Sequence, residues 1–193
     1  MTEPSPLQGQ LLEAQSLEDF LAALQRDAGA GRGPPPVERW DPPYCGEAGF
    51  EILADGTWKH EGARITRESM VRLFSSILRK DEDGATYLVT PVEKIRVDVA
   101  DAPFVAIRVD RLGEGRDQRI AFTTNVGDVV VLDENHPLRV HVSESGEPRP
   151  YVLVRGRLEA RVLRAPFYEL VGWAEMRDGV MGVWSCGGWF AVG

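Results

Sequence analysis

The sequence predicts an α+β fold made of two related β-hairpin–helix–β units. A pattern of strand, turn, strand, apolar helix and strand runs over residues 50–90 and returns over residues 151–185. In each copy a glycine follows the first strand, at Gly56 and at Gly156. Many short strands with only two core helices are typical of the α+β class, and a repeat of this size indicates internal duplication. Two such units are expected to enclose a groove.

Residues 1–36 are expected to form a helix followed by a linker. Apolar side chains recur at the i, i+3, i+4, i+7 spacing of one helix face, at Leu17, Phe20, Leu21 and Leu24. The glycine- and proline-rich run 29–36 ends this helix. The pattern therefore predicts an amphipathic helix over 17–27 that packs on the body of the protein or on a partner.

The N-terminal α+β domain is expected over residues 37–100. Prolines make 37–49 extended, and Asp55-Gly56 is a strong signal for a hairpin turn. The apolar pattern after Arg67 predicts one long helix, and Pro91 interrupts the strands that follow. The expected elements are strands at 50–53 and 57–60, a helix at 67–80, and strands at 87–90 and 92–99.

The C-terminal domain is expected over residues 101–193. Its arginine-rich hairpin turns at Gly156, and Pro166 is suited to the first position of its helix. The expected elements are strands at 104–111, 119–124, 129–132, near 140–142, 151–154 and 158–163, a helix at 166–176, and strands at 180–184 and 189–192.

Composition excludes several classes of protein. The net charge of −8 opposes general binding of nucleic acid. No apolar run approaches the roughly 18 residues that a membrane helix needs, and the N-terminus has no apolar core of a secretory signal. Cys45 and Cys186 lie far apart, which fits a reducing cytoplasm better than a disulfide framework. We therefore expect a cytoplasmic protein without a membrane span.

No catalytic or metal-binding motif is complete. The three histidines do not have the spacing of a zinc site, and the run before Ser185 has one residue too many for a nucleophile elbow. No dinucleotide or phosphate-loop fingerprint is present. We therefore predict a non-enzyme with no metal and no cofactor, and keep a hydrolase that uses Ser185 or Cys186 as a minor alternative.

Three segments are candidates for ligand binding. The arginine-rich hairpin 149–164 is suited to planar, bidentate recognition of phosphate or carboxylate, although a general preference for arginine explains it equally well. The corner 90–94 offers a carboxylate and an ammonium, or is a structural corner with exposed charges. The strand end 123–125 either contacts a ligand or forms a turn. The candidate contacts are Glu93, Lys94, Asn125, Tyr151, Arg155 and Arg161.

The alternation of side chains along a strand predicts that two of these candidates lie together. Tyr151 and Arg155 are four residues apart in one expected strand, which places both side chains on the same face. An arginine fork for a phosphate and a tyrosine ring for a base would then reach one ligand.

Several runs, in order along the chain, resemble a known family. They are Asp55-Gly-Thr-Trp58, Ile65-Thr-Arg67, Val71-Arg-Leu-Phe74, Tyr87-Leu-Val-Thr-Pro-Val-Glu-Lys94, Asp101-Ala-Pro-Phe104, Thr123-Thr-Asn125, His136-Pro-Leu138, Arg149-Pro-Tyr151, Leu158-Glu-Ala-Arg161 and Val183-Trp-Ser185. Over residues 36–193 the chain resembles the bacterial family called domain of unknown function 1285. It departs from the family at Lys59, His60 and Met70.

The resemblance implies a duplicated two-domain α+β fold whose C-terminal half is like a pleckstrin-homology domain. It also implies a nucleotide-like ligand at the domain interface and a role in signal transduction. The leading hypothesis is thus a non-catalytic cytoplasmic sensor of a small anionic ligand. The alternative is a protein-interaction module without a small ligand, which the expected 17–27 helix favours.

Overall fold

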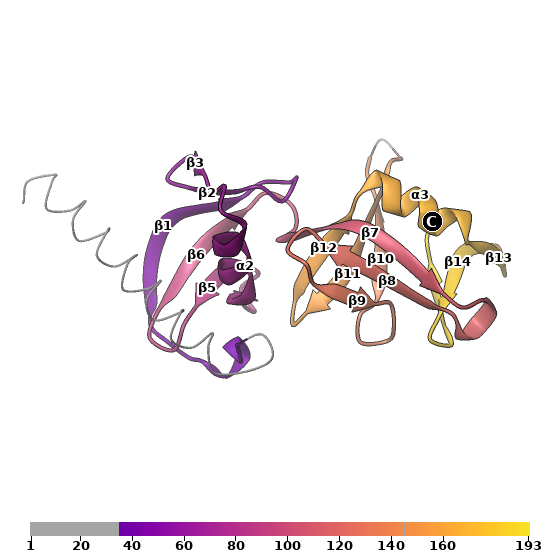
Figure 1. Ribbon diagram of the computed structural model, residues 1–193, viewed down its shortest axis with the longest axis horizontal. Coiled ribbons are helices and arrows are strands. Elements are labelled where there is room, and N and C mark those ends of the chain that lie inside the picture. Colours follow the sequence, from indigo (N-terminus) through magenta and orange to yellow (C-terminus); the bar gives the residue numbers. More distant parts are fainter. Residues whose placement is uncertain (1–34, 145) are drawn as a thin grey trace, which may run out of the picture.

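The computed structural model describes residues 35–193 except residue 145 (Figure 1). The expected 17–27 helix lies outside these residues. The chain forms two domains, each built on a six-stranded sheet with one helix. In the described part of the chain, no helix is long and apolar enough to cross a membrane. The observed fold is therefore a two-domain, mostly-sheet fold with two helices.

The N-terminal domain has the strand order β3-β2-β1-β6-β5-β4. Strands β1 and β6 run parallel, and every other neighbouring pair is antiparallel. Its elements are η1 (Val37–Arg39), β1 (Tyr44–Ile52), β2 (Trp58–His60), β3 (Ala63–Arg64), α2 (Glu68–Ser76), β4 (Leu78–Lys80), β5 (Thr86–Val89) and β6 (Lys94–Val99).

Helix α2 covers the face of this sheet that looks toward the C-terminal domain (Figure 1). Phe74 anchors it, with its ring 5.2 Å from that of Phe50 and 6.0 Å from that of Trp58. These three side chains are almost fully buried. The last turn of α2 thus anchors the helix in the core of the N-terminal domain.

The C-terminal domain has the strand order β10-β11-β12-β7-β8-β9 and a separate three-stranded sheet, β13-β14-β15. Here β12 and β7 form the parallel pair. The elements are β7 (Phe104–Leu112), η2 (Gly115–Asp117), β8 (Arg119–Thr124), β9 (Val129–Val131), β10 (Leu138–Val142), β11 (Pro148–Arg155), β12 (Leu158–Val162), α3 (Arg164–Gly172), β13 (Glu175–Arg177), β14 (Val180–Ser185) and β15 (Gly188–Ala191).

Both domains show the same order of a hairpin, a helix and a second hairpin. In the first domain these are β1–β2, α2 and β4–β5, and in the second they are β11–β12, α3 and β13–β14. The two differ in pairing, because β4 and β5 extend the main sheet whereas β13 and β14 belong to the small one. The repeated order makes duplication of one unit plausible.

Both helices are present, but their predicted bounds are wrong. The first ends at Ser76 rather than at residue 80, because Leu78–Lys80 forms strand β4 opposite β5. The second spans Arg164–Gly172 rather than 166–176, and Glu175–Arg177 forms β13. Pro166 is therefore the third helical residue, which is tolerated because the first-turn N–H groups have no partner within the helix.

Candidate functional site

The two domains meet through the turns of their corresponding hairpins. Gly56, in the β1–β2 turn, lies against Val105 and Asn125 of the C-terminal domain. Gly156, in the β11–β12 turn, lies against Glu38 of the N-terminal domain. A β-carbon at either glycine would come closer than 3.0 Å to the other domain. Close approach of the backbone at Gly56 thus limits how the domains meet, whereas at Gly156 the atom approached is the movable end of the Glu38 side chain.

Arg155, at the end of β11, braces this junction. Its Nη1 donates to Asp128 Oδ2 at 2.8 Å within its own domain, and its Nη2 donates to the Ser75 carbonyl of α2 in the other domain. The guanidinium also lies 4.9 Å from the ring centroid of Phe104. Two buried atoms at this point, Arg155 Nε and Ser75 Oγ, have no hydrogen-bond partner in the described residues. The predicted ligand contact Arg155 is thus already committed to holding the domains together.

Asn125 makes a second connection between the domains, and it lines the interdomain groove that is described below. Its Oδ1 accepts a hydrogen bond from the Val105 amide at 3.1 Å, and its Nδ2 donates to the Gly56 carbonyl at 3.4 Å. The long second bond leaves the amide group in weak contact with the N-terminal domain. Of the six predicted contacts, Asn125 is the one that lies in the wall of this groove.

The interdomain groove has a volume of about 390 Å³ and receives residues from both domains. The C-terminal domain supplies Asn125 and Val126. The N-terminal domain supplies the β1–β2 turn, the segment after β3 and the first turn of α2. The lining residues are Asp55, Gly56, Thr57, Trp58, Arg64, Ile65, Thr66, Glu68, Val71, Arg72, Asn125 and Val126.

The lining of the interdomain groove includes the start of helix α2 and Trp58. Within the described residues no side chain caps the first turn of this helix, so the free N–H groups carry the partial positive charge of a helix N-terminus. The Trp58 side chain, which is 1% exposed, has an indole N–H without a hydrogen-bond partner in the described part of the chain. Buried donors of this kind normally have a partner.

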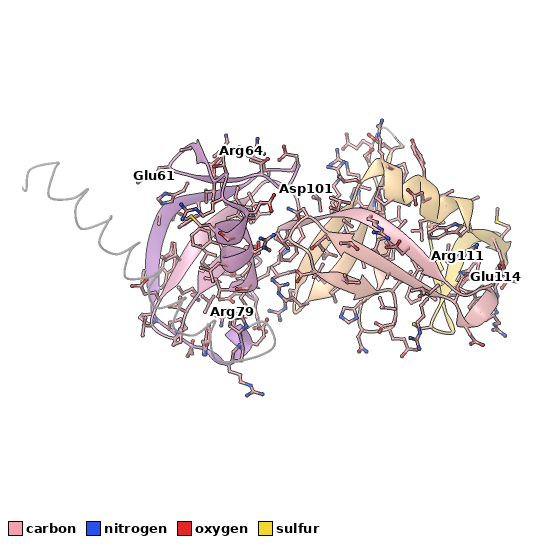
Figure 2. All side chains as sticks on the ribbon, in the orientation of Figure 1. Glu61, Arg64, Arg79, Asp101, Arg111 and Glu114 are labelled. Atoms are coloured by element: carbon pink, nitrogen blue, oxygen red, sulfur yellow. The ribbon has the colours of Figure 1, made fainter. Side chains whose placement is uncertain are left out.

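The charges around the groove are mixed. Arg72 makes an exposed ion pair with Glu68 at 3.4 Å, which is a weak interaction in water. The Thr57 amide donates to Asp55 at 2.9 Å and lowers the pKa of that carboxyl group, and the charge of Arg64 acts in the same direction. Asp55 is therefore ionised at neutral pH, and Figure 2 shows Arg64 at the surface of the N-terminal domain.

Tyr151 and Arg161 come together around Asp101 instead of around the groove. The Tyr151 hydroxyl donates to Asp101 Oδ1 at 2.7 Å, and Arg161 Nη1 donates to Asp101 Oδ2 at 3.1 Å. Asp101 lies in the connection between the two domains (Figure 2). Arg139 adds a cation 4.2 Å from the Tyr151 ring centroid. This cluster attaches the connection to the C-terminal sheet.

Tyr151 and Arg155 do not share a partner, contrary to the expectation from strand alternation. The pairing of β11 with β12 shifts between Leu153 and Arg155. Such a bulge breaks the alternation of side chains between the two faces. The side chains of Tyr151 and Arg155 consequently go to different partners, Asp101 and Asp128.

Glu93 and Lys94 lie apart from the other predicted contacts. Thr90 closes their turn, because its Oγ1 accepts from the Glu93 amide at 3.0 Å. Lys94 Nζ donates to Asp81 Oδ2 at 3.0 Å and lies 4.7 Å from the Tyr87 ring centroid. The structure therefore divides five of the six predicted contacts among the interdomain groove, the Arg155 brace, the Asp101 cluster and the Asp81 cluster, and places Glu93 in the turn that Thr90 closes.

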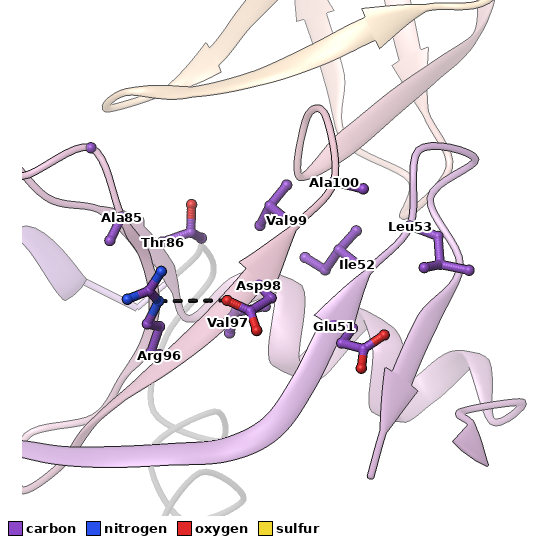
Figure 3. Close-up of a pocket in the computed structure, with 11 residues that line it drawn as sticks. Glu51, Ile52, Leu53, Ala85, Thr86, Arg96, Val97, Asp98, Val99 and Ala100 are labelled. Atoms are coloured by element: carbon purple, nitrogen blue, oxygen red, sulfur yellow. Dashed lines mark ion pairs between the residues drawn. The ribbon is translucent and has the colours of Figure 1, made fainter. Parts of the chain in front are cut away.

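Two other hollows are less suited to an anion. The second groove, of about 680 Å³, is lined by Glu38, by residues 79–83, and by Gly156 and Arg157, so acids outnumber bases in its wall. A pocket of about 340 Å³ lies on the N-terminal sheet alone (Figure 3), where Arg96 pairs with Asp98 at 3.5 Å. Neither combines a helix N-terminus with residues of both domains.

The sequence reasoning missed the groove residues Arg64 and Arg72. A usable signal was present for Arg64, because the mostly polar segment 64–68 comes directly before the apolar pattern of a helix. Ser185 was considered as a nucleophile, but its buried hydroxyl donates to the Leu132 carbonyl at 2.6 Å and accepts from the Ile120 amide at 3.0 Å. That hydroxyl links β14 to the main sheet. Cys45 and Cys186 are both free and exposed.

Comparisons with known proteins identify one family over both domains. Residues 35–102 match the N-terminal domain model of the DUF1285 family, a domain of unknown function, and residues 103–192 match its C-terminal domain model. A DUF1285 family protein from Silicibacter pomeroyi DSS-3 is 48% identical, with a TM-score of 0.79, over 87% of this chain and 93% of that one. One from Shewanella baltica OS155 is 27% identical, with a TM-score of 0.52, over 65% of this chain and 91% of that one. None of the curated proteins matches the chain.

Proposed function

Since the chain belongs to the DUF1285 family, whose function is unknown, we propose a function from its own residues: it binds a small anionic, nucleotide-like ligand in the interdomain groove without catalysing a reaction. The observation that carries the proposal is that the uncapped first turn of α2 opens into a groove lined by both domains. Helix N-termini bind phosphate and carboxylate groups. Trp58 belongs to the same lining, and its indole N–H is a buried donor without a hydrogen-bond partner in the described residues.

Charge and shape define the class of ligand. Arg64 and Arg72 supply two guanidinium groups for an anion, while Thr57, Thr66 and Asn125 supply neutral polar groups. The aliphatic side chains of the lining are suited to the apolar part of a nucleotide-like molecule. A volume of about 390 Å³ lies within the range of small-molecule sites.

This proposal changes the roles of the predicted contacts. Asn125 and the two groove arginines make direct contacts, whereas Arg155 keeps the two walls of the groove together. Tyr151 and Arg161 hold the connection between the domains through Asp101. Glu93 and Lys94 take no part in the interdomain groove.

The experiment is thermal unfolding of the full chain against a panel of nucleotides and cyclic dinucleotides. A ligand that binds only the native state raises the unfolding temperature saturably. At a hundred times its dissociation constant it adds about 2.7 kcal/mol to the free energy of unfolding. The Arg64→Ala variant should lose most of this rise. Arg149→Ala removes an exposed arginine of β11 far from the groove lining and should keep it. A flat panel, or an equal rise in both variants, would contradict the proposal.

Three broader statements belong to the same proposal. We place the protein in the cytoplasm because its two cysteines are free thiols. We assign it to bacterial signal transduction because a ligand in the groove would couple the two domains that line it. We also regard the two domains as duplicated units, supported by the reciprocal contacts of Gly56 and Gly156. The curled C-terminal sheet with its helix supports a likeness of this domain to pleckstrin-homology domains. It also supports placing the fold in the α+β class.

A further inference from the structure

Strand β13 is an open edge of the three-stranded sheet. The sheet order is β13-β14-β15, so within the described residues β13 has a neighbour on one side only. Its three residues, Glu175, Met176 and Arg177, are all exposed, and the Met176 side chain is 67% exposed. In Figure 1 this strand lies at the end of the molecule farthest from the N-terminal domain. An edge of this kind is a template for pairing with another strand.

The turn after β13 decides which backbone groups face outward. Asp178 and Gly179 form a two-residue turn with positive φ angles of 50° and 80°, the pattern of a type I′ hairpin. The residues next to such a turn, Arg177 and Val180, exchange both hydrogen bonds, and the pattern alternates along the strand. The N–H and C=O of Met176 consequently point away from β14, toward the open edge.

The sequence of β13 is complementary to itself when read in the opposite direction. Glu175 and Arg177 lie on the same face, one on each side of Met176. If a second copy approaches antiparallel with Met176 opposite Met176, each Glu175 lies opposite an Arg177. Opposite charges at directly facing positions stabilise a strand pair, and like charges destabilise it.

The surroundings of β13 favour the same contact. On β14 the exposed Met181 lies opposite Met176 and extends its apolar surface, and the exposed Val180 lies opposite Arg177 on the other face. Arg177 is half-exposed, makes an exposed ion pair of 3.6 Å with Asp178 in the turn, and its guanidinium carbon lies 5.1 Å from the Trp184 ring centroid. The edge strand β10 has no such match, because pairing around Val140 would oppose Arg139 and His141, which are both basic.

We propose that two copies of this chain associate through β13, with Met176 at the two-fold axis. The two small sheets then form one six-stranded sheet. Two backbone hydrogen bonds join the Met176 residues, and two ion pairs join Glu175 and Arg177 across the axis. A contact that uses the same patch on both copies closes on itself and gives a dimer rather than a filament.

Sedimentation equilibrium of the full chain and its charge variants tests this arrangement at concentrations up to about 1 mM. The unchanged chain should form a concentration-dependent dimer. Glu175→Arg and Arg177→Glu should each be monomeric at the same concentrations, since each opposes like charges at both positions. An equal mixture of these two variants should dimerise, because arginines of one copy then face glutamates of the other. The double variant Glu175→Arg, Arg177→Glu should also dimerise.

Arg116→Ala is the matched control. Arg116 lies 4.3 Å from the same Trp184 ring centroid but belongs to η2 rather than to the edge, so its removal should leave the dimer unchanged. An unchanged chain that stays monomeric over the whole range overturns the proposal. So does a dimer that the single variants do not weaken, or a mixture of the two variants that remains monomeric.

Discussion

Gly56 lies so close to Asn125 that a β-carbon on Gly56 would come within 2.7 Å of the Asn125 Nδ2 atom and 3.0 Å of the Val105 Cγ2 atom. Asn125 cannot move aside freely, because its Oδ1 is held by the Val105 amide. The contact therefore fixes the distance between the two domains and the width of the interdomain groove. At Gly156 a β-carbon would lie 2.6 Å from Glu38 Oε1, but this oxygen is the end of a flexible side chain that can move, so the constraint at Gly156 is weaker than at Gly56.

We expect Gly56→Ala to destabilise the chain more than Gly84→Ala does. Both glycines have a positive φ, 82° and 81°, so both substitutions cost about 1–2 kcal/mol of backbone strain. At Gly56 the new β-carbon also pushes on Asn125 and Val105, which adds about 1–3 kcal/mol. At Gly84 it meets nothing within 4 Å. Urea unfolding measures both values, and equal losses would show that the close approach is unimportant.

Arg155→Ala should lower the free energy of unfolding by about 2 kcal/mol, because it removes charge-assisted hydrogen bonds to Asp128 and to the Ser75 carbonyl. Arg157→Ala is the control from the same hairpin. Its pair with Glu82, at 2.9 Å, is exposed on both sides, so its loss should change stability by less than about 0.5 kcal/mol. Chemical denaturation distinguishes the two, and similar values would remove Arg155 from the role of a brace.

The sequence could locate most strands because their turn signals are local. Asp55-Gly56 and Asp178-Gly179 both form turns where a positive φ is needed. The end of α2 could not be predicted this way. Ile77 and Leu78 continue the apolar pattern of the helix, but they are buried because Leu78 pairs with Leu88 of β5. Apolar periodicity does not separate the last turn of a helix from a strand that follows at once.

The candidate site was harder to predict because it depends on contacts between the domains. The arginines of residues 149–164 stood out in the sequence, yet Arg155 and Arg161 are used in contacts to Asp128, Ser75 and Asp101. A bulge in β11 separated Tyr151 from Arg155. The groove itself brings the β1–β2 turn against the β8–β9 turn, about 70 residues away, which no local pattern encodes.

Ser185→Ala should cost about 2 kcal/mol of stability. The Ser185 side chain is fully buried, and its hydroxyl bridges the Leu132 carbonyl and the Ile120 amide. Alanine leaves both of these buried backbone groups with one partner fewer. Ser69→Ala, at an exposed position in α2, is the control and should be close to neutral. Calorimetric unfolding measures both, and a neutral Ser185→Ala would contradict a structural role for the hydroxyl.

Asp81 is the centre of a partly buried charge cluster. Arg79 donates to its two oxygens at 2.6 Å and 3.2 Å, and Lys94 Nζ donates to Oδ2 at 3.0 Å. Burial alone raises the pKa of the Asp81 carboxyl group, but the hydrogen bonds from Arg79 and Lys94 outweigh burial and bring the pKa below its usual value of 3.8. Arg79 also donates to the Val37 and Trp40 carbonyls, so the cluster holds the start of the domain.

Asp81→Asn should therefore destabilise the chain by about 2 kcal/mol at pH 7 and by progressively less in acid. A carboxyl group whose pKa is lowered on folding stabilises the protein above its unfolded pKa, about 3.9, and this stabilisation is lost as pH falls through the folded value. Protonated Asp81 then resembles asparagine, so the two unfolding curves should begin to approach each other near the unfolded pKa and converge only once the pH is below the lowered pKa of the folded state. Asp98→Asn, in an exposed pair with Arg96, should show almost no difference at either pH. An Asp81→Asn deficit of the same size at pH 7 and at low pH would mean that packing, and not the carboxylate charge, makes the contribution.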